Sequence, residues 1–153
     1  MSEFNQSIIK SCNDSWEQEF IPGKKNKENC SGFVKDVAKK LGILLPQTAD
    51  ADGIIDEINS KWIKLDSGKE AAQQASYGTF VLAGLRSTDH SPKRAHGHIV
   101  VVVDGPLYHQ GYPKSRGGST GGFTCQGDKS VGGVWNKLDR DSVAYYAFNP
   151  VCR

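Results

Sequence analysis

The pattern of apolar residues changes from helical to strand-like about halfway along the chain. The first half contains four segments with helical periodicity or helix-forming composition: 8–20, 33–41, 54–62 and 68–77. The second half contains four aliphatic or aromatic runs bounded by turn residues: 79–84, 98–103, 107–112 and 143–148. Helices followed by hairpin-connected strands predict an α+β fold, in which N-terminal helices pack on a C-terminal antiparallel β-sheet.

Length, charge and hydropathy limit the classes of protein that this chain can represent. Its 153 residues predict a single domain, 1–153, and 37% apolar with 24% charged residues is typical of a soluble globular protein. The 19 basic residues nearly balance the 17 acidic ones, so no basic face for nucleic acid is expected. The longest apolar run, 99–103, has the length of a strand, and residues 1–6 lack the features of a secretory signal peptide.

The segment 29–34, Asn-Cys-Ser-Gly-Phe-Val, places Cys30 in the first turn of a predicted amphipathic helix, after an N-capping residue. Unpaired N–H groups and the positive end of the helix dipole favour a thiolate at such a position. The small residues that follow leave room for a substrate carbonyl to reach backbone amides that would act as an oxyanion hole. The local pattern is equally compatible with Cys30 as a small, half-buried apolar residue.

A thiol nucleophile needs a base, and His98 is the histidine best placed to supply one. It follows Gly97 and opens the aliphatic run 99–103. Strand alternation puts His98, Val100 and Val102 on one face of the sheet and the intervening residues on the other. We therefore expect a rigid sheet to present this imidazole at the mouth of a buried strand.

The other three histidines are interpreted as non-catalytic. His90 and His96 lie in a polar stretch and are expected to be solvated loop residues, while His109 is expected on the surface of a return strand over 107–112. A metal site built from His96, His98 and a cysteine is disfavoured because no fourth ligand has a suitable spacing. We therefore expect neither a metal nor a cofactor.

Taken together, these motifs resemble the family 1 type VI secretion amidase effectors, which belong to the NlpC-type branch of papain-like cysteine peptidases. The resemblance covers nearly the whole chain and rests on several blocks in order: 26–34, 97–98, 105–108, 129–132, 134–136 and 139–141. It implies a single NlpC-like domain with a papain-like arrangement of helices and sheet.

The resemblance also implies an activity and the residues that carry it. The enzyme would hydrolyse the bond between the γ-carboxyl of D-glutamate and meso-diaminopimelate in peptidoglycan stem peptides. Cys30 would be the nucleophile and His98 the general base and then the general acid, with Ser31 and Tyr108 contacting the substrate. The group that orients His98 is left unassigned among His109, Gln110 and a backbone carbonyl near Gly117.

Partners and location follow from the same resemblance. The type VI apparatus would carry a toxin from the cytoplasm of the producer into the periplasm of a competitor, without a signal peptide. A cognate periplasmic immunity protein is expected to protect sibling cells, and the toxin is expected to be a monomer. Housekeeping or phage cell-wall hydrolases share this chemistry, and an inactive papain-like binding module is the alternative outside the enzyme class.

Three further cysteines, Cys12, Cys125 and Cys152, have no role in the expected reaction. A disulfide between Cys12 and Cys152 would tie the C-terminus to the first helix and would suit an oxidising periplasm. Relatives of the family can carry a bond between these regions. Cys125 leaves the two other pairings open.

Overall fold

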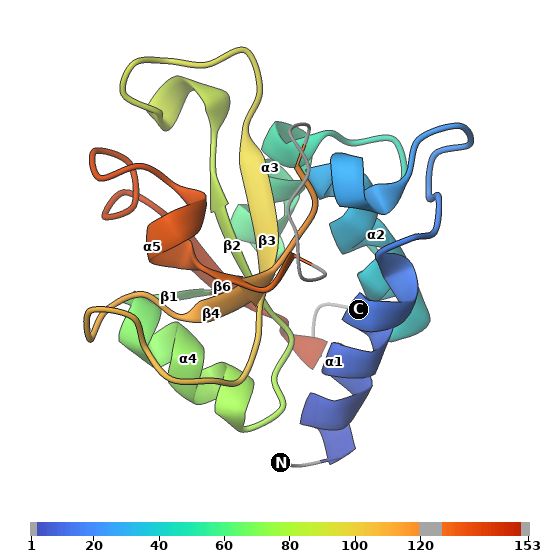
Figure 1. Ribbon diagram of the computed structural model, residues 1–153, viewed down its shortest axis with the longest axis horizontal. Coiled ribbons are helices and arrows are strands. Elements are labelled where there is room, and N and C mark those ends of the chain that lie inside the picture. The colour runs from blue at the N-terminus through green and yellow to red at the C-terminus, as the bar shows by residue number, and fades with distance from the viewer. Residues whose placement is uncertain (1–2, 120–126, 151–153) are drawn as a thin grey trace.

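The computed structural model describes residues 3–119 and 127–150, and it contains a six-stranded antiparallel sheet in the order β1-β6-β2-β3-β4-β5 (Figure 1). The strands are β1 (Ile63–Leu65), β2 (Val81–Leu85), β3 (His98–Val102), β4 (Lys114–Arg116), β5 (Lys129–Ser130) and β6 (Ala144–Ala147). The α-helices are α1 (Glu3–Ser15), α2 (Cys30–Lys40), α3 (Ala51–Lys61), α4 (Gly68–Ser76) and α5 (Val131–Val134), and the 3-10 helices are η1 (Asn26–Glu28) and η2 (Ser87–Asp89). The predicted α+β class is confirmed.

The two faces of the sheet bury separate apolar cores, and strand β3 contributes to both. Ile99, Val101 and Val103 pack in the core under α1, α2 and α3, whereas Val100 and Val102 pack in the core under α4 and α5. Figure 1 shows the two groups of helices on opposite sides of the sheet. The alternation predicted for this strand is therefore confirmed, and helices cover both faces rather than one.

Helix α2 lies at the centre of the first core. Its side chains Phe33, Val34 and Val37 are fully buried. Burying a side chain of this size contributes about 1.5–3 kcal/mol, so this one face holds the helix firmly against β3. The N-terminus of α2 is thereby placed beside the first residues of β3.

The first helix begins and ends earlier in the chain than its apolar periodicity predicts. It ends at Ser15, although Trp16 remains buried. The last carbonyl groups are satisfied from outside the helix, since Asn26 Nδ2 donates to Ser15 O at 2.8 Å and Lys27 N donates to Trp16 O at 3.1 Å. Because the carbonyl oxygens of Ser15 and Trp16 have partners outside the helix, the helix can end here without leaving them unpaired.

The predicted return strand over 107–112 is wrong. These residues form a turn closed by a bridge between Tyr108 and Tyr112, and its tip places His109 at φ 48° and Gln110 at φ 61°. Such left-handed residues interrupt a strand. The strand that pairs with β3 on the side away from β2 is instead β4, which is short and polar. No helix among the described residues is long and apolar enough to span a membrane.

Candidate active site

Cys30 is the first residue of α2 and lies against the start of β3. Its side chain is partly buried and packs on the first core. The backbone N–H groups of Ile99, Ser31 and Cys30 itself are directed at the sulfur. Since Ile99 directly follows His98, the thiol is brought next to the predicted base by main-chain contacts.

A buried asparagine anchors the N-terminus of α2. Asn26 is fully buried, and its Nδ2 donates to Ser15 O and to Asp36 Oδ2, both at 2.8 Å. Its Oδ1 accepts from Phe20 N at 3.0 Å. This one side chain joins the end of α1, the following turn and the body of α2, so the position of Cys30 does not depend on the helix alone.

The residues beside Cys30 have packing roles that the motif did not reveal. Asn29 occupies the N-cap position, but its side chain makes no capping hydrogen bond; its Oδ1 accepts from Ser31 Oγ at 3.1 Å instead. A Cβ atom on Gly32 would lie 2.6 Å from Asn29 Nδ2. A side chain at position 32 would therefore have to displace the side chain of Asn29.

His98 is the first residue of β3, and its ring is held by an aromatic neighbour. The ring makes an edge contact with Trp135, with centroids 5.4 Å apart and planes at 71°. Burial lowers the pKa of His98 from 6.5 to about 4, and electrostatic interactions with His90 and Arg94 act in the same direction. The imidazole is consequently neutral at pH 7, which is the form that accepts a proton.

The thiol of Cys30 does not have the lowered pKa that its helix position suggests. Burial raises this pKa, while the N–H groups of Ile99, Ser31 and Cys30 act in the opposite direction with a smaller effect. The helix end does favour the thiolate, but burial has the larger effect on the pKa. The solvation that a thiolate loses in this site exceeds the stabilisation that the three backbone N–H groups provide. The free enzyme therefore holds a neutral thiol beside a neutral imidazole.

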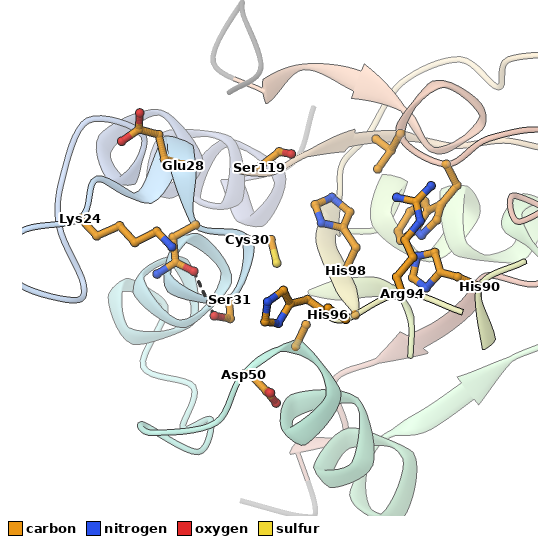
Figure 2. Close-up of a pocket in the computed structure, with 16 residues that line it drawn as sticks. Lys24, Glu28, Cys30, Ser31, Asp50, His90, Arg94, His96, His98 and Ser119 are labelled. Atoms are coloured by element: carbon orange, nitrogen blue, oxygen red, sulfur yellow. Dashed lines mark hydrogen bonds between the residues drawn. The ribbon is translucent and has the colours of Figure 1, made fainter. Parts of the chain in front are cut away.

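Both side chains open into one cavity of about 520 Å³. In Figure 2, Cys30 lies between Ser31 and His98, and His98 projects toward it from β3. The cavity is lined by Lys24, Glu28, Asn29, Cys30, Ser31, Asp50, Ala51, His90, Arg94, Ala95, His96, Gly97, His98, Ser119, Val134 and Trp135. Among the described residues, no group of three or more His, Cys, Asp or Glu side chains is arranged to hold a metal ion.

Comparison with known proteins identifies the family. Over 151 residues the chain is 44% identical to the peptidoglycan amidase Tse1 of Pseudomonas aeruginosa, and the match covers 97% of this chain and 94% of that protein. The chain belongs to the Tse1-like peptidoglycan amidase family. No protein-family model matches it. The family expected from the motifs is confirmed, and with it the assignment to the hydrolases.

In this Tse1-like chain, three of the four predicted site residues meet in the cavity. Cys30, Ser31 and His98 line it, and Tyr108 does not. Tyr108 is 48% exposed and its ring lies against His109, with centroids 4.1 Å apart. The left-handed turn at 109–110 carries both aromatic rings away from the cavity.

The prediction that His90 is solvated is wrong. Only 4% of its surface is exposed, and it lines the cavity. Its Nδ1 donates to the carbonyl of Arg86 at 2.9 Å, since a carbonyl oxygen can only accept. Trp135 is likewise only 4% exposed and forms part of the cavity wall. No local sequence signal marks either residue, because both are brought to the cavity by packing between distant segments.

The segment around Gly117 packs against η1, which directly precedes the N-cap of α2. A Cβ atom on Gly118 would lie 1.9 Å from Asn26 O, and Ser119 N donates to Lys27 O at 3.0 Å. These close contacts bring Ser119 into the cavity wall. His109 and Gln110 do not line the cavity, and the group that orients His98 stays unassigned.

The predicted disulfide concerns residues that are only partly described. Cys12 is fully buried in the first core, among the apolar side chains of α1 and α2. Cys125 and Cys152 both lie outside the described residues. The pairing of Cys12 with Cys152 therefore remains a prediction from the family resemblance.

We expect Gly97→Ala to disturb the position of His98. A Cβ atom there would lie 2.2 Å from Asp52 Oδ1 and 3.0 Å from the backbone oxygen of Leu85. The Asp52 carboxylate has little freedom to move, because it accepts from Ser87 N at 2.9 Å and from Ser87 Oγ at 2.5 Å. The expected loss of unfolding free energy is about 1–3 kcal/mol.

This loss is measured by urea unfolding of wild type and the Gly97→Ala variant. Gly111→Ala is the matched control for loss of a glycine outside the site, because the nearest atom to its Cβ position, the backbone oxygen of His109, lies at an ordinary contact distance of 3.9 Å. A Gly97→Ala variant as stable and as active as wild type would show that this close packing does not position His98.

Proposed function

We propose that this protein is a peptidoglycan amidase that uses Cys30 as nucleophile and His98 as general base and acid. The scissile bond in this proposal joins the γ-carboxyl of D-glutamate to meso-diaminopimelate. The supporting observation is that a helix N-terminal thiol and a strand-borne neutral imidazole open into one cavity. The same chain is 44% identical to the peptidoglycan amidase Tse1.

The reaction begins from the neutral pair. His98 accepts the proton of Cys30 as the sulfur attacks the carbonyl carbon of the amide, and negative charge moves to the carbonyl oxygen. Backbone N–H groups at the start of α2 stabilise that oxyanion. The carbon–nitrogen bond then breaks, the imidazolium of His98 gives its proton to the departing amine, and a thioester to Cys30 remains.

Hydrolysis of the thioester completes the cycle. His98 accepts a proton from a water molecule, which attacks the thioester carbon and forms a second tetrahedral intermediate. Collapse of that intermediate breaks the carbon–sulfur bond and releases the carboxylic acid. The proton returns from His98 to the sulfur, which restores the neutral thiol and imidazole that burial favours.

The biological setting is proposed from the family alone. In this proposal the enzyme is an antibacterial toxin that a type VI apparatus delivers into the periplasm of a competing Gram-negative cell. A cognate periplasmic immunity protein inhibits it by covering the rim of the cavity around Cys30 and His98. A complex that leaves these two side chains accessible to solvent would contradict this mode of inhibition.

The decisive experiment is digestion of purified Gram-negative peptidoglycan, with Cys30→Ala as the control and mass spectrometry as the readout. We expect new fragments that end in D-glutamate and partners that begin with the free amine of meso-diaminopimelate, with none from the variant. Fragments cut elsewhere in the stem would overturn the assignment of the scissile bond but would still show that the protein is a peptidoglycan-cleaving enzyme. No Cys30-dependent product would leave a papain-like binding module as the better interpretation.

Labelling by thiol reagents does not replace that experiment. Burial raises the pKa of Cys30, so the free enzyme is expected to react slowly at neutral pH even if Cys30 is the nucleophile. Slow labelling would therefore not distinguish the enzyme from an inactive module. Hydrolysis that depends on Cys30 does.

A further inference from the structure

The proposed reaction assigns the two halves of the substrate to opposite sides of the cavity. The acyl half stays on the sulfur of Cys30, while the departing amine receives its proton from His98. In Figure 2, Lys24 and Glu28 lie on the Cys30 side, and Arg94 and His90 lie beyond His98. Arg94 is close enough to His98 for its charge to lower the pKa of the imidazole. The leaving half of the substrate is thus expected to extend toward Arg94.

Arg94 lines the cavity with a guanidinium that no carboxylate of the described residues neutralises. Arg86, which directly precedes η2, differs from Arg94, because Arg86 Nε lies 2.7 Å from Asp56 Oδ1. Two acidic residues do line the cavity, Glu28 and Asp50, but they belong to η1 and to the N-cap of α3 rather than to the loop of Arg94. The charge of Arg94 is therefore available to a ligand.

The loop that carries Arg94 is held in place by hydrogen bonds of its backbone and of Ser87 rather than by the arginine side chain. Arg94 N donates to Ser87 O at 3.0 Å, and Ser87 is fixed in turn by the Asp52 carboxylate. Ser91 N donates to the carboxylate of Asp139 at 2.7 Å, and Asp139 is only 1% exposed. An exposed guanidinium on a firmly anchored loop is suited to recognition, because little backbone ordering is needed when a ligand binds.

We propose that Arg94 binds the side-chain carboxylate of the amino acid that leaves, and so selects meso-diaminopimelate over L-lysine. This inference rests on the proposed function. The two amino acids present the same departing amine and a side chain of similar length, but only diaminopimelate carries a carboxylate at the far end. A guanidinium matches a carboxylate through two parallel hydrogen bonds. The acidic groups Glu28 and Asp50 on the other wall would repel that carboxylate, which favours one orientation of the substrate.

The test compares two synthetic peptides that contain L-alanine, γ-linked D-glutamate and either meso-diaminopimelate or L-lysine. We expect wild type to cleave the diaminopimelate peptide with a kcat/KM about five-fold higher, the upper range for an exposed ion pair. Arg94→Gln is expected to bring the ratio close to one, mainly by raising KM for the diaminopimelate peptide. Arg94→Lys, which keeps the charge and loses the planar geometry, is expected to retain part of the preference.

Lys93→Gln is the matched control, since Lys93 is an exposed cation on the same loop that does not line the cavity. It should keep the ratio of wild type. If Arg94→Gln has the same ratio of kcat/KM values for the two peptides as wild type, with an unchanged unfolding midpoint, Arg94 does not select diaminopimelate. The proposed amidase activity would not be affected by that result. Cleavage of neither peptide by wild type would instead overturn the proposed function, and this inference with it.

Discussion

His98→Gln is expected to lower kcat/KM for peptidoglycan stem peptides by about a thousand-fold, with little change in KM. General acid–base catalysis by a positioned side chain contributes about 10²–10⁴ in rate, and His98 would act at both the attack and the departure of the amine. Because Cys30 is held as a neutral thiol by burial, it depends on this base more than a preformed thiolate would. Glutamine keeps a polar side chain of comparable size against Trp135 and cannot carry the proton.

The measurement is steady-state cleavage of a purified stem peptide, followed by chromatography, for wild type and two variants. His96→Gln is the matched control, because His96 lines the same cavity but is exposed and precedes the strand. It is expected to keep activity within a few-fold of wild type. A large loss in His96→Gln together with an active His98→Gln would reverse the assignment of the base.

Acidification from pH 7 to pH 4 is expected to remove about 3 kcal/mol of folding stability through His98 alone. The pKa of this imidazole is about 4 in the folded protein and near 6.5 when the chain is unfolded, so the unfolded state binds the proton more tightly. The full contribution of His98 to stability is present above pH 6.5. This contribution is lost as pH falls from 6.5 through 4, because in that range the imidazole of the unfolded chain binds a proton and the imidazole of the folded protein does not.

Urea unfolding at pH 7 and pH 4, for wild type and His98→Gln, isolates this contribution. Carboxylates that also titrate in this range affect both proteins equally, so the difference between their two pH dependences belongs to His98. We expect the variant to lose about 3 kcal/mol less than wild type on acidification. Parallel pH dependences of the two proteins would show that burial does not hold His98 neutral.

Short-range patterns in the sequence predicted the elements that carry the proposed catalytic pair. Cys30 begins α2 as predicted, and His98 begins β3, whose alternating residues separate between the two cores as expected. These features depend on periods of two and about 3.6 residues, which apolar side chains must follow in any strand or helix that buries one face. The family could be assigned for a related reason, since its motifs are short and occur in order.

Only the tertiary structure decided what surrounds that pair. His90 is buried although its neighbours are polar, Tyr108 lies outside the cavity, and Cys30 has a raised rather than a lowered pKa. Each of these properties depends on segments far away in the chain that pack over the residue, and no local pattern reports such packing. The sequence determined which side chains face the core of each element, whereas solvation, and with it the protonation state of the thiol and the imidazole, was determined by how the elements assemble.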